Sequence, residues 1–72
     1  MEAGVRNRVS GEIEAIKADE IMAEVKMRGT WQDNTMRFTS VMTRESLEDA
    51  GFKQGDKVDA LVKAINVVFV KH

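Results

Sequence analysis

The first third of the chain alternates between apolar and polar residues. In segment 5–16 the even positions from 6 to 14 are charged or polar, and the odd positions carry Val5, Val9, Ile13 and Ala15. A period of two predicts a strand with one buried face. Gly11 interrupts this run, and a glycine inside a strand indicates a bulge or a tight bend.

Two further segments, 21–27 and 35–42, alternate in the same way. We expect a strand in each, although Glu, Lys and Ala are poor strand formers and leave a helix open as an alternative in the first. The polar residues 17–20 predict a turn. Residues 28–34 contain Gly, Asp and Asn, which is typical of a hairpin loop. The sides expected to face inward carry Ile21, Ala23, Val25 and Met27, then Met36, Phe38, Ser40 and Met42.

One short helix is expected over residues 44–50. Thr43 before it is a typical N-cap, and Glu45 and Glu48 suit the positive amino end of the helix dipole. Gly51 suits the left-handed residue that follows a last helical turn.

The last quarter of the chain predicts two more strands. Segment 58–64 alternates, whereas Val67–Val70 is apolar on both parities. A strand of the second kind is covered on both faces, so we expect one face against the interior and the other against a second subunit. The order of three strands, one helix and two strands predicts an all-β fold. This is a five-stranded, OB-fold-like Greek-key barrel with its short helix between strands 3 and 4.

Length and composition limit what such a chain can do. Its 72 residues contain no proline and no linker, so residues 1–72 are expected to form a single domain. A domain of this size buries little surface and commonly needs additional stabilisation from a disulfide, a metal ion or a partner subunit. The chain has no cysteine and one histidine, His72, which excludes disulfides and thiolate or His-rich metal sites. Self-association is the remaining source of such stabilisation.

The charge balance also bears on partners and location. There are 11 basic and 12 acidic residues, for a net charge of −1, which gives no electrostatic footprint for nucleic acid. No apolar run approaches the roughly 18 residues of a membrane span, and the opening MEAGVRNR lacks a signal-peptide core. We therefore expect no membrane partner and a cytoplasmic location.

Catalysis is not expected. The carboxylates lie on polar parities or in turns, and no nucleophilic cysteine, P-loop or dinucleotide-binding glycine pattern occurs. An OB barrel that binds single-stranded nucleic acid is an alternative, but it needs stacking aromatics on a basic groove. Of the four aromatic residues only Trp31 falls in an expected loop. A tryptophan in such a loop more often covers neighbouring apolar surface or contacts another subunit than stacks on a base.

Anion binding is better supported by the start of the expected helix. A helix amino end presents unpaired N–H groups, and here the hydroxyls of Thr43 and Ser46 lie beside them. A fully ionised oxyanion accepts hydrogen bonds and donates none, so its site consists of donors. The simpler interpretation of Thr43 alone is an N-cap.

Three segments taken together resemble a known family. They are GVRN at 4–7, VMTRES at 41–46 and VKAINV at 62–67. They resemble the signature segments of the molbindins, the small molybdate- and tungstate-binding Mop proteins, whose domain is also called TOBE. The intervening LEDAGFKQGDKVDALVKA is similar to that family's helix, glycine turn and fourth strand. The similarity covers nearly the whole chain.

The resemblance implies an OB-like barrel that assembles as a hexamer, a trimer of dimers, with molybdate or tungstate held between subunits for storage. The positions that match the family's oxyanion site are Val5, Arg6, Asn7, Thr43, Ser46, Lys63 and Ala64. Two positions depart from the pattern. Gly4 stands where a serine is usual, and Ala64 lacks the hydroxyl that some members carry there.

The residues themselves are compatible with this assignment. Arg6 and Lys63 supply the two positive charges that a dianion needs, while Val5 can offer a backbone amide. Arg6 and Lys63 could equally be solvated charges on polar parities, and Asn7 could be a turn residue. A further alternative is a structural assembly domain whose anion site has decayed, as the two departures would then indicate.

Overall fold

The computed structural model describes residues 6–72 as an antiparallel sheet with one short helix. The elements in chain order are β1 (Arg6–Ala18), β2 (Met22–Trp31), β3 (Asn34–Thr43), α1 (Arg44–Ala50), β4 (Lys57–Lys63) and the 3-10 turn η1 (Ala64–Asn66). The predicted all-β class, the strand at 21–27 and the helix between the third and fourth strands are confirmed.

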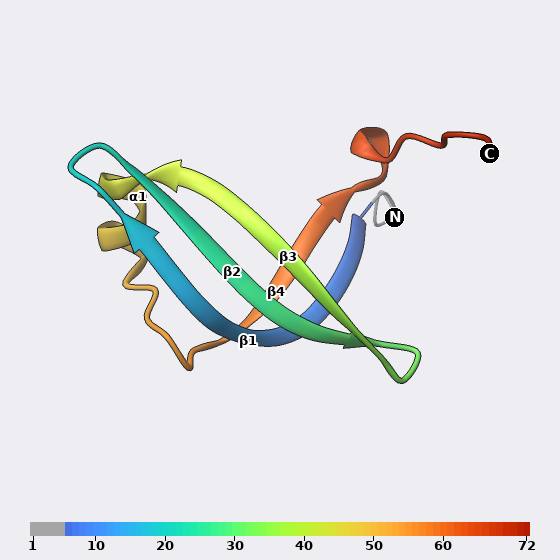
Figure 1. Ribbon diagram of the computed structural model, residues 1–72, viewed down its shortest axis with the longest axis horizontal. Coiled ribbons are helices and arrows are strands. Elements are labelled where there is room, and N and C mark those ends of the chain that lie inside the picture. Colours follow the sequence, from blue (N-terminus) through green and yellow to red (C-terminus); the bar gives the residue numbers. More distant parts are fainter. Residues whose placement is uncertain (1–5) are drawn as a thin grey trace, which may run out of the picture.

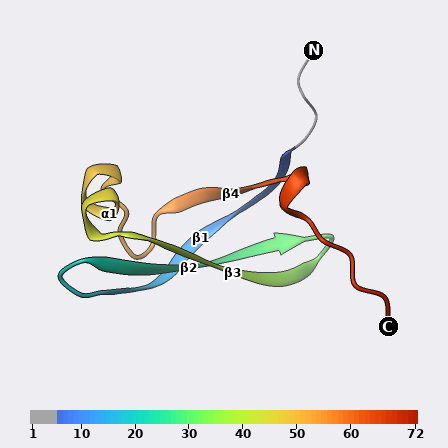
Figure 2. The same ribbon diagram turned by 90° about the horizontal axis from the view of Figure 1, so that it is seen from above.

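The four strands form one sheet in the order β3-β2-β1-β4. Every neighbouring pair is antiparallel. The sheet is long, twisted and bent, with α1 at one end and η1 at the other (Figures 1 and 2). Residues next to α1 and residues next to η1 therefore lie at opposite ends of one sheet.

One face of the sheet carries the core, and we call it the core face. Its buried side chains are Val9, Ile13, Ala23, Val25 and Met27, all from β1 and β2. On β3 the side chains of this same face, Phe38 and Met42, are only half-buried. Alternation thus gave the correct face of β2 and β3, but Ile21, which was predicted to face inward, lies before β2 and is 72% exposed. It did not show that one chain leaves the β3 side of this face open.

Gly11 was predicted to mark a bulge or a tight bend, and the strand register does not shift there. It pairs with Gly29 on β2 and with Val58 on β4. A Cβ atom at position 11 would overlap the carbonyl oxygen of Arg28 and lie 2.7 Å from the Cα of Gly29. Glycine is required because backbones approach closely there, at a bend of β1.

The bulge itself lies three residues later. The register passes from Ile13 opposite Met27 to Ala15 opposite Lys26, which leaves Glu14 without a strand partner. Because one extra residue reverses the alternation, Ile16 comes to lie opposite the buried Val25. The prediction that Ala15 continues the inward parity was therefore wrong.

The β2–β3 connection is shorter than predicted. β2 ends at Trp31 and β3 begins at Asn34. Only Gln32 and Asp33 form the turn, with φ of 49° and 67°. Two consecutive positive φ angles are typical of the two-residue turns that suit the twist of a hairpin. Trp31 is consequently a strand residue at the hairpin tip, 46% exposed.

The predicted fifth strand is absent from the part of the chain that the structure describes. Residues 67–70 follow η1 without any strand pairing, and the sheet has β3 and β4 as its two edges. The prediction of a closed five-stranded barrel was therefore wrong for a single chain. The apolar composition of this segment was read correctly, but composition does not reveal which sheet edge a segment will pair with.

Candidate functional site

The first group of predicted site residues lies at the start of α1. Thr43 is the N-cap, with extended backbone, and its Oγ1 accepts a hydrogen bond from the Ser46 amide at 3.0 Å. The same hydroxyl donates to Ser46 Oγ at 2.9 Å. The only hydroxyl proton of Thr43 is thus already donated, whereas the Ser46 hydroxyl keeps its own proton to donate outward.

Residues that sequence reasoning did not single out hold this end of the helix. The Arg44 amide donates to the carbonyl of Ile21 at 2.7 Å, and its guanidinium donates to the carbonyl of Asp19 at 3.2 Å. Arg44 also pairs with Glu48 at 3.1 Å. The only sequence signal was the position of Arg44 at the helix start, where an arginine is not expected to favour the dipole.

Asp19 organises the turn to which Arg44 is attached. Its carboxylate accepts from the amides of Met22 at 2.7 Å and Ile21 at 2.8 Å. These two backbone hydrogen bonds, with a smaller contribution from the charge of Arg44, hold the pKa of the Asp19 carboxyl below its usual value. The turn between β1 and β2 and the start of α1 therefore form one hydrogen-bonded unit.

The second group lies where β1 begins and β4 ends. Arg6 and Lys63 are direct cross-strand partners in the register of these strands. Asn7 is the next pair along, opposite Val62, whose carbonyl accepts from its side-chain amide at 3.3 Å. Ala64 opens η1 immediately after Lys63. Val5 and Gly4 lie outside the described residues.

One chain does not bring the two groups together. The start of α1 is at one end of the sheet and η1 is at the other, in both views of the molecule (Figures 1 and 2). Asn7, Thr43, Ser46, Lys63 and Ala64 are all exposed. Each group is therefore an open set of exposed residues, and within one chain the donors of the two groups do not meet.

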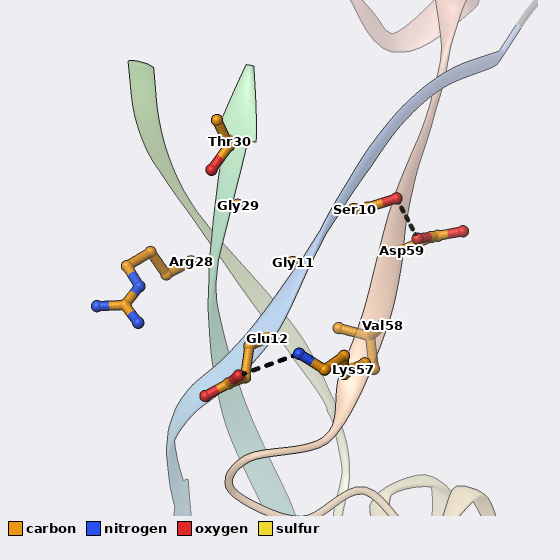
Figure 3. A pocket seen from close by; sticks show the side chains of 9 residues that line it. All are labelled: Ser10, Gly11, Glu12, Arg28, Gly29, Thr30, Lys57, Val58 and Asp59. Atoms are coloured by element: carbon orange, nitrogen blue, oxygen red, sulfur yellow. Dashed lines mark hydrogen bonds and ion pairs between the residues drawn. The ribbon is translucent and has the colours of Figure 1, made fainter. Parts of the chain in front are cut away.

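A separate polar groove of about 550 Å³ lies on the face opposite the core face, and it contains none of the predicted residues. Figure 3 shows its side chains pairing with each other: Lys57 with Glu12 at 3.8 Å, and Ser10 with Asp59 at 2.7 Å. The carboxylates Glu12 and Asp59 offset the charges of Arg28 and Lys57 in the lining, so the groove offers a dianion no net positive charge. This groove is therefore a poorer oxyanion site than either end of the sheet.

Residues 6–72 contain no group of three or more His, Cys, Asp or Glu side chains that could hold a metal ion. Among these same residues no helix is long and apolar enough to cross a membrane.

Comparison with known proteins assigns the family. The sequence model of the TOBE domain matches residues 4–69. The chain belongs to the TOBE domain family. Molybdenum-pterin-binding protein 3 of Clostridium pasteurianum is 30% identical over 70 residues, which are 97% of this chain and 98% of that protein. Molybdenum-pterin-binding protein 1 of the same organism is 27% identical over the same proportions.

Solved structures agree with this TOBE assignment. MopII from Clostridium pasteurianum superposes with a TM-score of 0.78 at 27% identity, over 97% of this chain and all of that one. A molybdate-binding protein from Sporomusa ovata gives a TM-score of 0.76 at 28% identity, over 99% of this chain and all of that one. The resemblance found from the three sequence segments is thereby confirmed at the level of family and fold.

Proposed function

We propose that this TOBE domain binds molybdate or tungstate reversibly, as a homo-oligomer that stores and buffers the oxyanion in the cytoplasm. The observation that carries the proposal is the register of β1 on β4, which sets Arg6 opposite Lys63 beside Ala64. Two cationic residues on neighbouring strands are what a tetrahedral dianion requires. The full-length similarity to proteins named for molybdate or molybdenum-pterin supplies the identity of the anion.

The hydroxyl group of the site is assigned to Ser46. Because the Thr43 hydroxyl already accepts from one group and donates to another, its task is to position Ser46. Ser46 then donates to an anion oxygen, together with Arg6, Lys63 and backbone amides near Val5 and Ala64. Asn7 has a backbone partner in one chain and is a secondary donor. Binding requires no covalent step, so no catalytic activity is proposed.

The site is completed between subunits. The two donor groups lie at opposite ends of one sheet, so a second chain must bring the start of its α1 to the η1 end of the first. A hexamer built as a trimer of dimers is the assembly that the family resemblance implies. Burial between chains would also strengthen each hydrogen bond to the anion by excluding water.

Selectivity follows from the chemistry of the donors. Phosphate carries a proton near neutral pH and needs an acceptor, which a set of donors does not supply. Sulfate carries no proton but is smaller than molybdate, so cavity size must distinguish them. A pterin ring would be expected to stack on an aromatic side chain, and the assigned residues include none, so the bare oxyanion is the proposed ligand.

Titration calorimetry with molybdate, tungstate, sulfate and phosphate tests the proposal. Micromolar binding of a group-six anion and much weaker binding of the other two is the expected result. Native mass spectrometry on the same samples counts subunits and ions. An oligomer that ignores all four anions would instead indicate a structural assembly domain. Salt-dependent binding of short single strands with quenching of Trp31 would indicate a nucleic-acid module.

A further inference from the structure

Side-chain packing does little to fix the direction of α1. The helix has seven residues and none of them is buried. A helix of this length is also marginal in water on its own. The direction of its first turn, and with it the direction of the Ser46 hydroxyl, must therefore be set by hydrogen bonds where β3 passes into α1.

Arg44 joins this junction to the turn between β1 and β2. Thr43, the last residue of β3, lies opposite Met22 in the register of the two strands. The Arg44 amide continues this pairing by one residue, because it donates to the Ile21 carbonyl at 2.7 Å. The guanidinium adds a second connection, since its Nη1 donates to the Asp19 carbonyl at 3.2 Å. Figures 1 and 2 both show the turn between β1 and β2 beside α1.

The Arg44 side chain also extends this connection into the helix. Its Nε donates to the Glu48 carboxylate, one turn further along α1, at 3.1 Å. The guanidinium therefore spans from the β1–β2 turn to the second turn of the helix. A positive charge at a helix amino end is unfavourable to the dipole, and an exposed ion pair adds little stability. The geometry that Arg44 imposes explains its position better than the stability it adds.

Asp19 holds the other side of the connection. Its carboxylate accepts from the amides of Ile21 at 2.8 Å and Met22 at 2.7 Å. Its own amide donates to the Met22 carbonyl at 2.9 Å. The carboxylate thus fixes the turn whose two carbonyls, those of Asp19 and Ile21, receive Arg44. A series of hydrogen bonds therefore runs from the Asp19 carboxylate to the first residue of α1.

We propose that Asp19 and Arg44 are positioning residues of the oxyanion site, which set the direction of α1 and so aim the Ser46 hydroxyl at the anion. Neither residue touches the anion, and both act through Ser46. Hydrogen bonds weaken steeply as their angle departs from linearity, so a small tilt of α1 is enough to lose this donor. The inference rests on the proposed function and adds to it the residues outside the donor set that determine affinity.

The charge of Asp19 separates positioning from simple electrostatics. A negative charge repels a dianion, so Asp19→Ala would strengthen binding if charge alone mattered. Positioning predicts the opposite sign, which is weaker binding. The loss should not exceed that of Ser46→Ala, about fivefold for one neutral hydrogen bond, because both changes act on the same hydroxyl.

Titration calorimetry with molybdate on single and double variants tests the inference. Asp19→Ala and Arg44→Ala should each weaken binding by about three- to fivefold. Asp19→Asn keeps an acceptor for the turn amides and should retain most of the affinity. In the Ser46→Ala background, neither Asp19→Ala nor Arg44→Ala should cause a further loss, because their effects pass through Ser46. If Asp19→Ala does not fold, Arg44→Ala at its exposed position carries the same test.

Asp56→Ala is the matched control. The Asp56 carboxylate also holds a turn, accepting from the Lys53 amide at 2.9 Å, but this turn follows α1 and does not contact its start. The control should bind molybdate like the natural chain, and circular dichroism checks that each variant keeps the sheet.

Two results would overturn the inference alone while the natural chain binds molybdate. One is unchanged or tighter binding by Asp19→Ala and Arg44→Ala. The other is a loss of equal size in the Ser46→Ala background, since the two residues would then act on the anion without Ser46. A natural chain that binds no group-six anion would overturn the proposed function and this inference with it.

Discussion

Thr43 and Ser46 illustrate how two neighbouring hydroxyls can have different tasks. Thr43 Oγ1 caps the amide of Ser46, and Ser46 Oγ accepts from Thr43 while retaining its own proton. Thr43→Ala should therefore destabilise the fold by about 1 kcal/mol, the usual effect of losing an N-cap. Ser46→Ala should affect stability less and weaken molybdate binding by about 1 kcal/mol, the scale of a neutral hydrogen bond.

Urea unfolding and calorimetry on both variants measure the two effects separately. Thr43→Ser keeps the cap and is the matched control for the first. The division of tasks is contradicted if Ser46→Ala binds molybdate like the natural chain while Thr43→Ser does not.

Arg6 and Lys63 are the residues on which the charge argument depends. Replacing either with Ala should weaken molybdate binding by about 1.5–3 kcal/mol, because a hydrogen bond from a charged donor is lost. Lys57→Ala is the control, since Lys57 pairs with Glu12 on the opposite face and is not part of the proposed site. Unchanged affinity in both Arg6→Ala and Lys63→Ala, measured by calorimetry, would refute the site assignment.

Asp19 gives the fold a dependence on acid. Its pKa is lowered in the folded state by the amides of Met22 and Ile21, so its contribution is present above the ordinary value of 3.8. That contribution is lost as the pH falls through the lower folded-state pKa. Thermal melts between pH 2 and pH 7 should show a decrease in Tm on the acid side that is smaller in Asp19→Asn. A variant that keeps the full acid dependence would show that other carboxylates cause it.

At the scale of elements, alternation predicted β2, β3 and β4 because each has one face toward the core and no irregularity. It failed in β1 because the bulge at Glu14 reverses the parity, and a bulge leaves no mark in composition. The glycine that looked like a bulge, Gly11, is instead a point of close backbone approach. Both features depend on the neighbouring strands, which a single strand's sequence does not contain.

Gly11 provides a direct test of this close approach. In Gly11→Ala the new methyl group would meet backbone atoms of Arg28 and Gly29, which cannot move without shifting β2. We expect destabilisation of about 3 kcal/mol, the upper end for overpacking. Thr30→Ala, an exposed β2 position close by, should change stability by less than about 0.5 kcal/mol. Urea midpoints decide between them, and a stable Gly11→Ala chain would contradict the geometry.

The same limit applies to the candidate site. Its residues could be named from sequence because three short segments match a family pattern. The sequence did not predict that these residues lie at two ends of the sheet. It also did not predict that Asp19 and Arg44 support one of those ends. Both features depend on which strands are neighbours. The segment 67–70 is the clearest example. Its apolar pattern predicted a strand, but residues 67–70 have no strand pairing in the described chain, because composition does not say which sheet edge a segment can reach.

For the whole molecule, folding, assembly and anion binding should be linked. A chain of this size covers few side chains, so the assembled state is expected to supply much of the stability. An anion that binds only between subunits stabilises only that state, by about 2.7 kcal/mol at a free concentration a hundredfold above Kd.

Molybdate should therefore raise Tm, and Tm should also rise with protein concentration. Sulfate at the same ionic strength is the control for general salt effects. A molybdate-induced rise in Tm of an isolated monomer would contradict a site between subunits.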